Sequence, residues 1–69
     1  MNVGQRFWWH IEEIEKAGWE AEIIIRGRHK LVTLTTPEGQ FYGDLGTINE
    51  AMDQAMADAR MTIEANREH

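Results

Sequence analysis

The spacing of apolar residues changes twice along this chain, and this change limits the folds that the chain can adopt. Near the start, Phe7, Ile11 and Ile14 recur every three or four residues, which is typical of an amphipathic helix. The middle of the chain alternates apolar and polar residues with a period of two, and the last third returns to helical spacing. The sequence therefore predicts a helix, a group of strands and a second helix.

The first helix is expected to begin at about residue 3 or 5 and to end at Ala17. Val3 extends its apolar stripe, and the glycine that follows directly, Gly18, suits a left-handed C-cap. Alternation then predicts a strand over residues 19–26. The apolar face of this strand is formed by Trp19, Ala21, Ile23 and Ile25. Ile24 is expected on the opposite face.

Two further strands are expected over residues 30–36 and 40–45, where β-branched and aromatic residues are frequent. The segment TPEG between them predicts a type I turn with Gly39 in the left-handed conformation. If Thr36 pairs with Gln40, Leu34 shares a sheet face with Tyr42. The other face then carries Leu31, Phe41 and Leu45. The pattern leaves open which set faces the helices, and therefore which neighbours join Ile24.

The last helix has a clear start, because the segment TINE forms a capping box between Thr47 and Glu50. Its apolar stripe continues to about Asn66 and consists of Ile48, Ala51, Met52, Ala55, Met56, Ala59 and Ile63. We expect one domain over residues 1–69 in the α+β class. It is a three-stranded antiparallel meander with two helices on one face, in the order α-β-β-β-α.

Composition and charge exclude several classes of protein. Hydrophobic residues make up 42% of the 69 residues and charged residues 28%, which fits a globular chain. The longest apolar run is Ile23–Ile25, too short to span a membrane, and the first residues do not resemble a signal peptide. We therefore expect a soluble, cytoplasmic protein. A domain this small without cysteine often gains stability by dimerising.

The sequence offers no catalytic or metal-binding pattern. His10, His29 and His69 lie far apart, and none has a second ligand at metal spacing. The chain contains neither serine nor cysteine as a nucleophile, and the segment GDLGT has no phosphate-loop lysine and is interpreted as a turn. We expect no enzyme activity, no metal and no cofactor.

Two adjacent tryptophans in the first helix indicate a contact outside the core. With Phe7, Ile11 and Ile14 pointing inward, Trp8 falls at the edge of the buried stripe and Trp9 roughly opposite to it. One interpretation is that Trp8 seals the core edge and Trp9 lies along a neighbouring loop or the helix surface. The other is that Trp9 anchors a partner, since tryptophan is enriched at binding hot spots. The expected partner-binding residues are Trp8, Trp9, Glu12, Glu13 and Ile24.

Basic residues gather at one turn although the formal net charge is −5. Arg26, Arg28, His29 and Lys30 fall within five residues, RGRHK, and are candidates for contact with nucleic acid. In element order the chain resembles the double-stranded RNA-binding domain, whose first hairpin carries a Gly-Pro-x-His loop where this chain has RGRH. The resemblance implies that the tip enters a minor groove. The chain departs from the family by lacking the loop proline and the lysines at the start of the last helix, where it reads TINEAMDQ.

These observations favour a non-enzymatic protein-binding module. The excess of 12 acidic residues over 7 Lys and Arg favours a partner with a basic surface, such as a complex that handles nucleic acid. In size and acidity the chain looks like the small inhibitors that phages and mobile elements use against host defence complexes, including the anti-CRISPR proteins. The alternatives are a nucleic-acid-binding domain that uses the tip at residues 26–30, and a structural homodimer.

Overall fold

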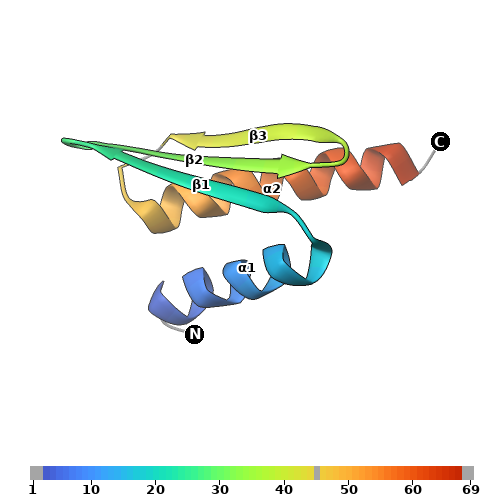
Figure 1. The fold of residues 1–69 in the computed structure, drawn as a ribbon, viewed down its shortest axis with the longest axis horizontal. Coiled ribbons are helices and arrows are strands. Elements are labelled where there is room, and N and C mark those ends of the chain that lie inside the picture. Colours follow the sequence, from blue (N-terminus) through green and yellow to red (C-terminus); the bar gives the residue numbers. More distant parts are fainter. Residues whose placement is uncertain (1–2, 45, 68–69) are drawn as a thin grey trace.

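The structure is a computed structural model that describes residues 3–44 and 46–67 (Figure 1). The described residues form two helices and three strands in the predicted order α-β-β-β-α. The elements are α1 (Val3–Ala17), β1 (Glu20–Arg26), β2 (His29–Thr36), β3 (Gly39–Asp44) and α2 (Ile48–Arg67). The fold class is α+β, and both helices lie on the same side of the sheet (Figure 1).

The strands form an antiparallel meander in the order β1-β2-β3, and the register of β2 with β3 differs from the expectation. Thr36 pairs with Gly39 rather than with Gln40, so only Pro37 and Glu38 lie in the turn. The Thr36 hydroxyl accepts a hydrogen bond from the Glu38 amide at 3.1 Å and donates one to the Gly39 carbonyl oxygen at 3.0 Å. Gly39 has the expected positive φ, 131°. The side chain of Thr36 therefore closes a shorter turn than predicted.

This one-residue shift exchanges the partners across the sheet. Leu34 lies opposite Phe41 rather than sharing a face with Tyr42, so that part of the prediction was wrong. The side facing the helices carries Ala21, Ile23, Ile25, Val32, Leu34, Phe41 and Gly43. The outer side carries Ile24, Leu31, Thr33 and Tyr42. The predicted position of Leu45 lies outside the described residues.

The core lies between α2 and the helix-facing side of β2 and β3. Its buried side chains are Ile14, Val32, Leu34, Ala51, Met52, Ala55, Met56 and Ala59. The predicted stripe of α2 is thus confirmed, with Ile48 and Ile63 half-buried at its two ends. One half of the predicted capping box is confirmed, since the Glu50 amide donates to the Thr47 hydroxyl oxygen at 3.1 Å. The Glu50 carboxylate reaches back to Thr47, where it accepts a hydrogen bond from the hydroxyl group at 3.2 Å. These features anchor α2 along its whole buried face.

A glycine allows α2 to approach the sheet closely. Gly43 and Asp44 lie inside β3, within the strand expected over residues 40–45, so the interpretation of GDLGT as a turn was wrong for these two residues. Gly43 faces the backbone of Ala51 in the first turn of α2, where even a methyl group has no room. The small side chains of Ala51, Ala55 and Ala59 continue this close approach along the helix.

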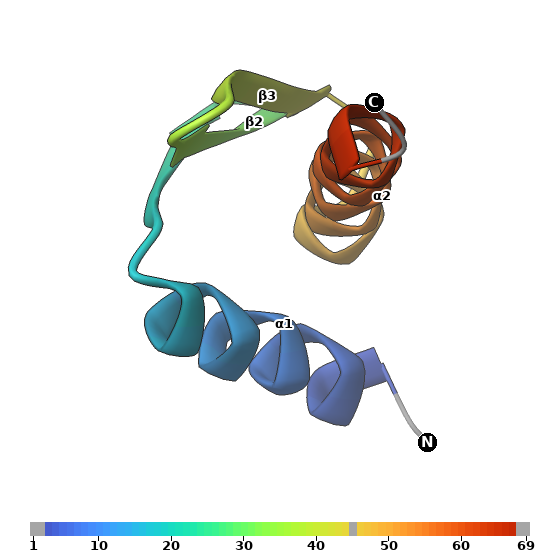
Figure 2. The same cartoon turned by 90° about the vertical axis from the view of Figure 1, so that its right-hand side faces the viewer.

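Helix α1 is positioned differently from α2. Gly18, with a φ of 75°, ends the helix as predicted, and the Trp19 amide bonds the Ile14 carbonyl oxygen at 3.0 Å. The chain then turns into β1, and the sheet curves from β3 round to β1 with α1 lying across the open side of that curve (Figure 2). Helix α1 therefore contacts α2 and only a small part of β1.

The helix-facing side of β1 is left open by this arrangement. Trp19 packs partly buried against the core just before the strand begins. Farther along, Ile23 is 39% exposed and Ile25 is 59% exposed, although both point to the same side as the buried Val32. The predicted apolar face therefore exists, but most of it is not covered.

No helix within the described part of the chain is both long enough and apolar enough to cross a lipid bilayer.

Candidate partner-binding surface

The most exposed tryptophan of α1 is Trp8. Its side chain is 62% exposed, and its indole N–H donates a hydrogen bond of 3.0 Å to the Glu12 carboxylate one helical turn later. The i,i+4 spacing places the two side chains side by side on the helix surface. We call this pair the Trp8 surface. It presents a large aromatic ring, held in one orientation, directly beside a negative charge.

Trp9 is less exposed than Trp8, which reverses the expected order. It is 46% exposed, and the guanidinium carbon of Arg60 in α2 lies 5.5 Å from its ring centroid. Arg60 also donates a hydrogen bond to the carboxylate of Glu13. Trp9 and Glu13 therefore contact α2. The interpretation that Trp8 seals the core edge was wrong, because Trp8 is the more exposed of the two tryptophans.

The reversal follows from the rotation of α1 about its own axis. The predicted inward stripe was Phe7, Ile11 and Ile14, but His10 is as buried as Ile14, at 5%, while Phe7 and Ile11 are half-buried. A polar residue is buried without large cost only when it is hydrogen-bonded. His10 Nε2 lies 2.7 Å from the Asp53 carboxylate of α2 and meets this condition, whereas the buried Nδ1 of the same ring has no hydrogen-bond partner among the described residues.

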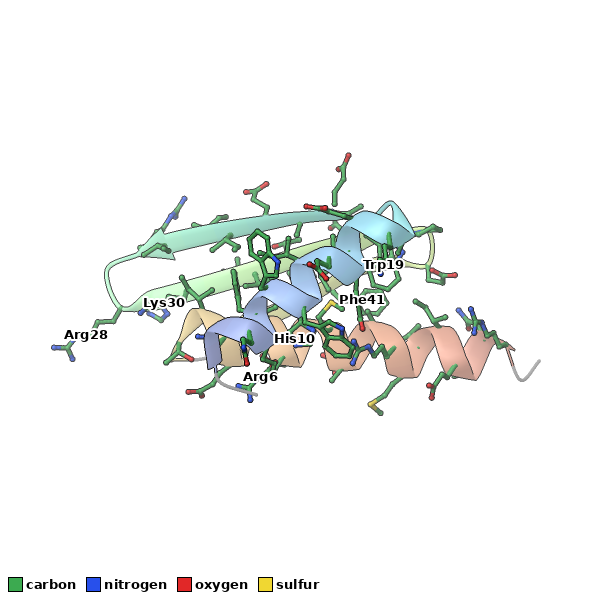
Figure 3. The ribbon with its side chains drawn as sticks, turned by 90° about the horizontal axis from the view of Figure 1, so that it is seen from below. Arg6, His10, Trp19, Arg28, Lys30 and Phe41 are labelled. Carbon is green, nitrogen blue, oxygen red and sulfur yellow. The ribbon has the colours of Figure 1, made fainter. Side chains whose placement is uncertain are left out.

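Polar contacts thus join the two helices. Arg6 Nη2 lies 2.9 Å from the same Asp53 carboxylate, and the Arg60–Glu13 pair lies farther along the seam. Figure 3 shows Arg6 and His10 on the side of α1 that faces α2. We call Arg6, His10 and Asp53 the Asp53 cluster. No local sequence pattern indicates Arg6, Asp53 or Arg60, because their partners are 43 or more residues away in the chain.

The outer side of the sheet holds the fifth expected binding residue. Ile24 lies there as predicted, opposite Leu31, on the side of the sheet that faces away from the helices. A shallow hollow of about 380 Å³ is lined by Ile24, Arg26, His29, Leu31 and Asp44. Tyr42 is exposed on the same side of the sheet. The structure therefore separates Ile24 from Trp8, Trp9, Glu12 and Glu13 rather than joining them in one site.

The basic residues at the β1–β2 turn do not converge on one surface. Arg28 projects from the tip, whereas Lys30 turns back toward the body, where its ammonium donates to the Gly46 carbonyl oxygen at 3.4 Å (Figure 3). Arg26 and His29 lie on the outer side, and His29 Nδ1 is 3.9 Å from the Asp44 carboxylate. An acidic group beside the tip lowers its attraction for phosphate.

The described residues contain no group of three or more His, Cys, Asp or Glu side chains that could hold a metal ion. Of the three histidines, His10 lies in the Asp53 cluster and His29 lies at the β1–β2 turn, while His69 lies outside the described residues.

Comparison of this chain with models of protein families, with curated proteins and with solved structures finds no match.

Proposed function

We propose that this chain is a non-enzymatic protein-binding module that uses the Trp8 surface to dock on a partner with a basic surface. The observation that carries the proposal is the hydrogen bond from Trp8 to Glu12, because it holds an exposed indole in one orientation. A side chain that is already ordered loses less conformational entropy when a partner covers it. Tryptophan also offers a large contact area with only two side-chain torsions.

Charge supports the choice of a basic partner. Glu12 and Glu15 are exposed on α1, and the whole chain carries a net charge of −5. Complementary charge speeds association and disfavours acidic partners. Arg and Lys of the partner would meet the Glu12 carboxylate, and an Arg would also stack on the Trp8 ring. Basic surfaces of this kind occur on complexes that handle nucleic acid, so an inhibitor that covers such a surface is the form of this function that we favour.

The experiment is affinity capture from a lysate of the source cells, with and without nuclease. Three baits are compared: wild type, Trp8→Ala and Met61→Ala. Met61 is an exposed apolar residue on α2, at 68%, so it controls for the loss of any exposed apolar side chain. We expect a protein that survives nuclease treatment, is lost with Trp8→Ala and is retained with Met61→Ala. Capture that does not depend on Trp8 would overturn the proposal.

The alternative function is nucleic-acid binding at the β1–β2 turn, which is supported by the projecting Arg28 (Figure 3). Under this alternative, Arg28→Glu would abolish the recovery of nucleic acid and Trp8→Ala would not affect it. Binding would also weaken steeply as salt is raised, because phosphate contacts release counterions. Fluorescence anisotropy with a labelled RNA duplex and a labelled DNA duplex measures both effects.

A further inference from the structure

Strand β1 is an edge strand whose free side is apolar. Within the described parts of the chain it pairs only with β2, and in Figure 3 it runs along one border of the molecule. Natural edge strands are usually protected by charged side chains that point inward, by proline or by a covering element. The charges of β1, at Glu20, Glu22 and Arg26, all lie on the outer side of the sheet. The helix side carries only Ala21, Ile23 and Ile25.

The free backbone groups of β1 are identified by the pairing pattern. Arg26 and His29 close a hairpin with two residues in its loop, so they exchange both backbone hydrogen bonds. Because the pattern alternates, Ile25, Ile23 and Ala21 direct their N–H and C=O groups away from β2. These three residues therefore offer an unpaired ladder to another strand.

The opposite edge of the sheet is β3, and this edge is partly protected. In β3 the same alternation of backbone hydrogen bonds directs the N–H and C=O groups of Asp44 away from β2. The Asp44 amide is bonded there by the side-chain oxygen of Gln54 in α2 at 3.0 Å. Helix α2 also packs along β3. The unprotected edge among the described strands is therefore β1.

We propose that two copies of this chain pair through their β1 edges as antiparallel strands, with Ile24 on the two-fold axis. The segment EIIIR, residues 22–26, is complementary to itself in this register. Glu22 of each copy lies opposite Arg26 of the second copy, and Ile23 lies opposite Ile25. The two sheets then form one continuous sheet of twice the width, and the exposed isoleucines of the helix side are paired with each other.

Other registers fit less well. A two-fold axis at Ile23 also matches the hydrogen-bonding pattern, but it places Glu22 opposite Ile24 and Ile25 opposite Ala21, so charge meets apolar surface. Parallel pairing in register places Glu22 against Glu22, which is repulsive. The Ile24-centred register is the one that matches both charge and apolar residues.

This interface is made by the backbone and side chains of β1, whereas the Trp8 surface belongs to α1, and the proposed pairing does not depend on the proposed function. The experiment is sedimentation equilibrium over a range of protein concentrations. The variants are Glu22→Arg, Arg26→Glu and the double variant that carries both. Each single change places like charges opposite one another twice in the dimer. We expect each single variant to raise the dimer Kd about tenfold and the double variant to restore it.

Controls separate the interface from general effects of charge and folding. Glu38→Arg makes the same change of charge as Glu22→Arg at an exposed turn position away from β1 and leaves the dimer Kd unchanged. Ile25→Lys abolishes the dimer, while circular dichroism of the dilute protein stays as in wild type because Ile25 is already exposed in one copy. The charge reversals on β1 leave Trp8 and Glu12 unchanged, so failure of this interface and failure of the proposed function are distinguishable.

Two results would overturn pairing through β1, and a third would overturn only its register. One is a wild-type protein that remains monomeric up to about 1 mM. The other is a dimer that the single charge reversals do not weaken, which would place the interface elsewhere. Glu20 lies opposite Arg26 of the second copy only when the two-fold axis lies at Ile23. If Glu20→Arg raises the dimer Kd and Glu22→Arg does not, the Ile24-centred register is overturned.

Discussion

A Cβ atom built on Gly43 would lie 1.7 Å from the carbonyl oxygen of Ala51, so the backbones of β3 and α2 touch at this point. Neither group can move away alone, since each belongs to a regular element. Gly43→Ala should therefore lower the free energy of unfolding by about 3 kcal/mol or more, as in severe overpacking. Urea unfolding followed by circular dichroism measures this change.

Gly46→Ala is the matched control for this prediction. A Cβ at Gly46 meets nothing within 4 Å, so the same substitution is expected to change stability little. Equal effects of the two substitutions would show that α2 does not lie against β3 as described.

The Asp53 cluster predicts that one carboxylate stabilises the packing of α1 on α2. Asp53→Ala removes the partner of both Arg6 and the buried His10. We expect a loss of about 2 kcal/mol in the free energy of unfolding, because buried polar groups lose their hydrogen bonds. The exposed Asp58 of the same helix provides the control, and Asp58→Ala should have a small effect. A small effect of Asp53→Ala as well would contradict the cluster.

The contact of Arg60 with Trp9 and Glu13 predicts a smaller, salt-dependent contribution. The Arg60 and Glu13 side chains are 42% and 31% exposed, so water and ions weaken their interaction. Arg60→Ala should lower the free energy of unfolding by about 1 kcal/mol at low salt and by less at high salt. Arg67→Ala, at an exposed position of the same helix, tests for a general effect of removing a positive charge. If the two losses are equal, the contact with Trp9 contributes nothing.

The start of α2 predicts a side-chain cap that only certain residues replace. Thr47→Ala removes the oxygen that accepts the Glu50 amide hydrogen and should cost about 1 kcal/mol in unfolding free energy. Thr47→Ser keeps that oxygen and should cost little. Thermal unfolding of the two variants compares them directly, and equal losses in both would argue against the cap.

Local patterns were sufficient for the element order and for most boundaries. Gly18 ends α1 and Thr47 begins α2 as predicted, because each acts on the backbone within a few residues of itself. The turn at Pro37 and Glu38 shows the limit of such reasoning. Because the turn is one residue shorter than predicted, Leu34 lies opposite Phe41 and not opposite Tyr42. Neighbouring side chains of a strand point to opposite faces, so Tyr42 lies on the other side of the sheet.

The candidate site was predicted less completely than the fold. Hydrophobic periodicity treats His10 and Glu13 as surface residues. The predicted buried stripe of α1 was therefore displaced around the helix from the observed one, and Trp9 was expected to be more exposed than Trp8. The bonding groups that allow these polar residues to face α2 are Asp53 and Arg60. They lie in the other helix, and nothing in the neighbourhood of α1 indicates them.

The amino-acid pattern thus established the α+β class, the α-β-β-β-α order, the caps and the buried stripe of α2, since all of these depend on contacts between residues close in the chain. The tertiary arrangement decided which surfaces stay open. Helix α1 leans on α2 and leaves Ile23 and Ile25 of β1 uncovered, and its rotation leaves Trp8 more exposed than Trp9. The physical reason is that spacing identifies which side of an element is apolar, whereas burial of that side depends on which distant element covers it.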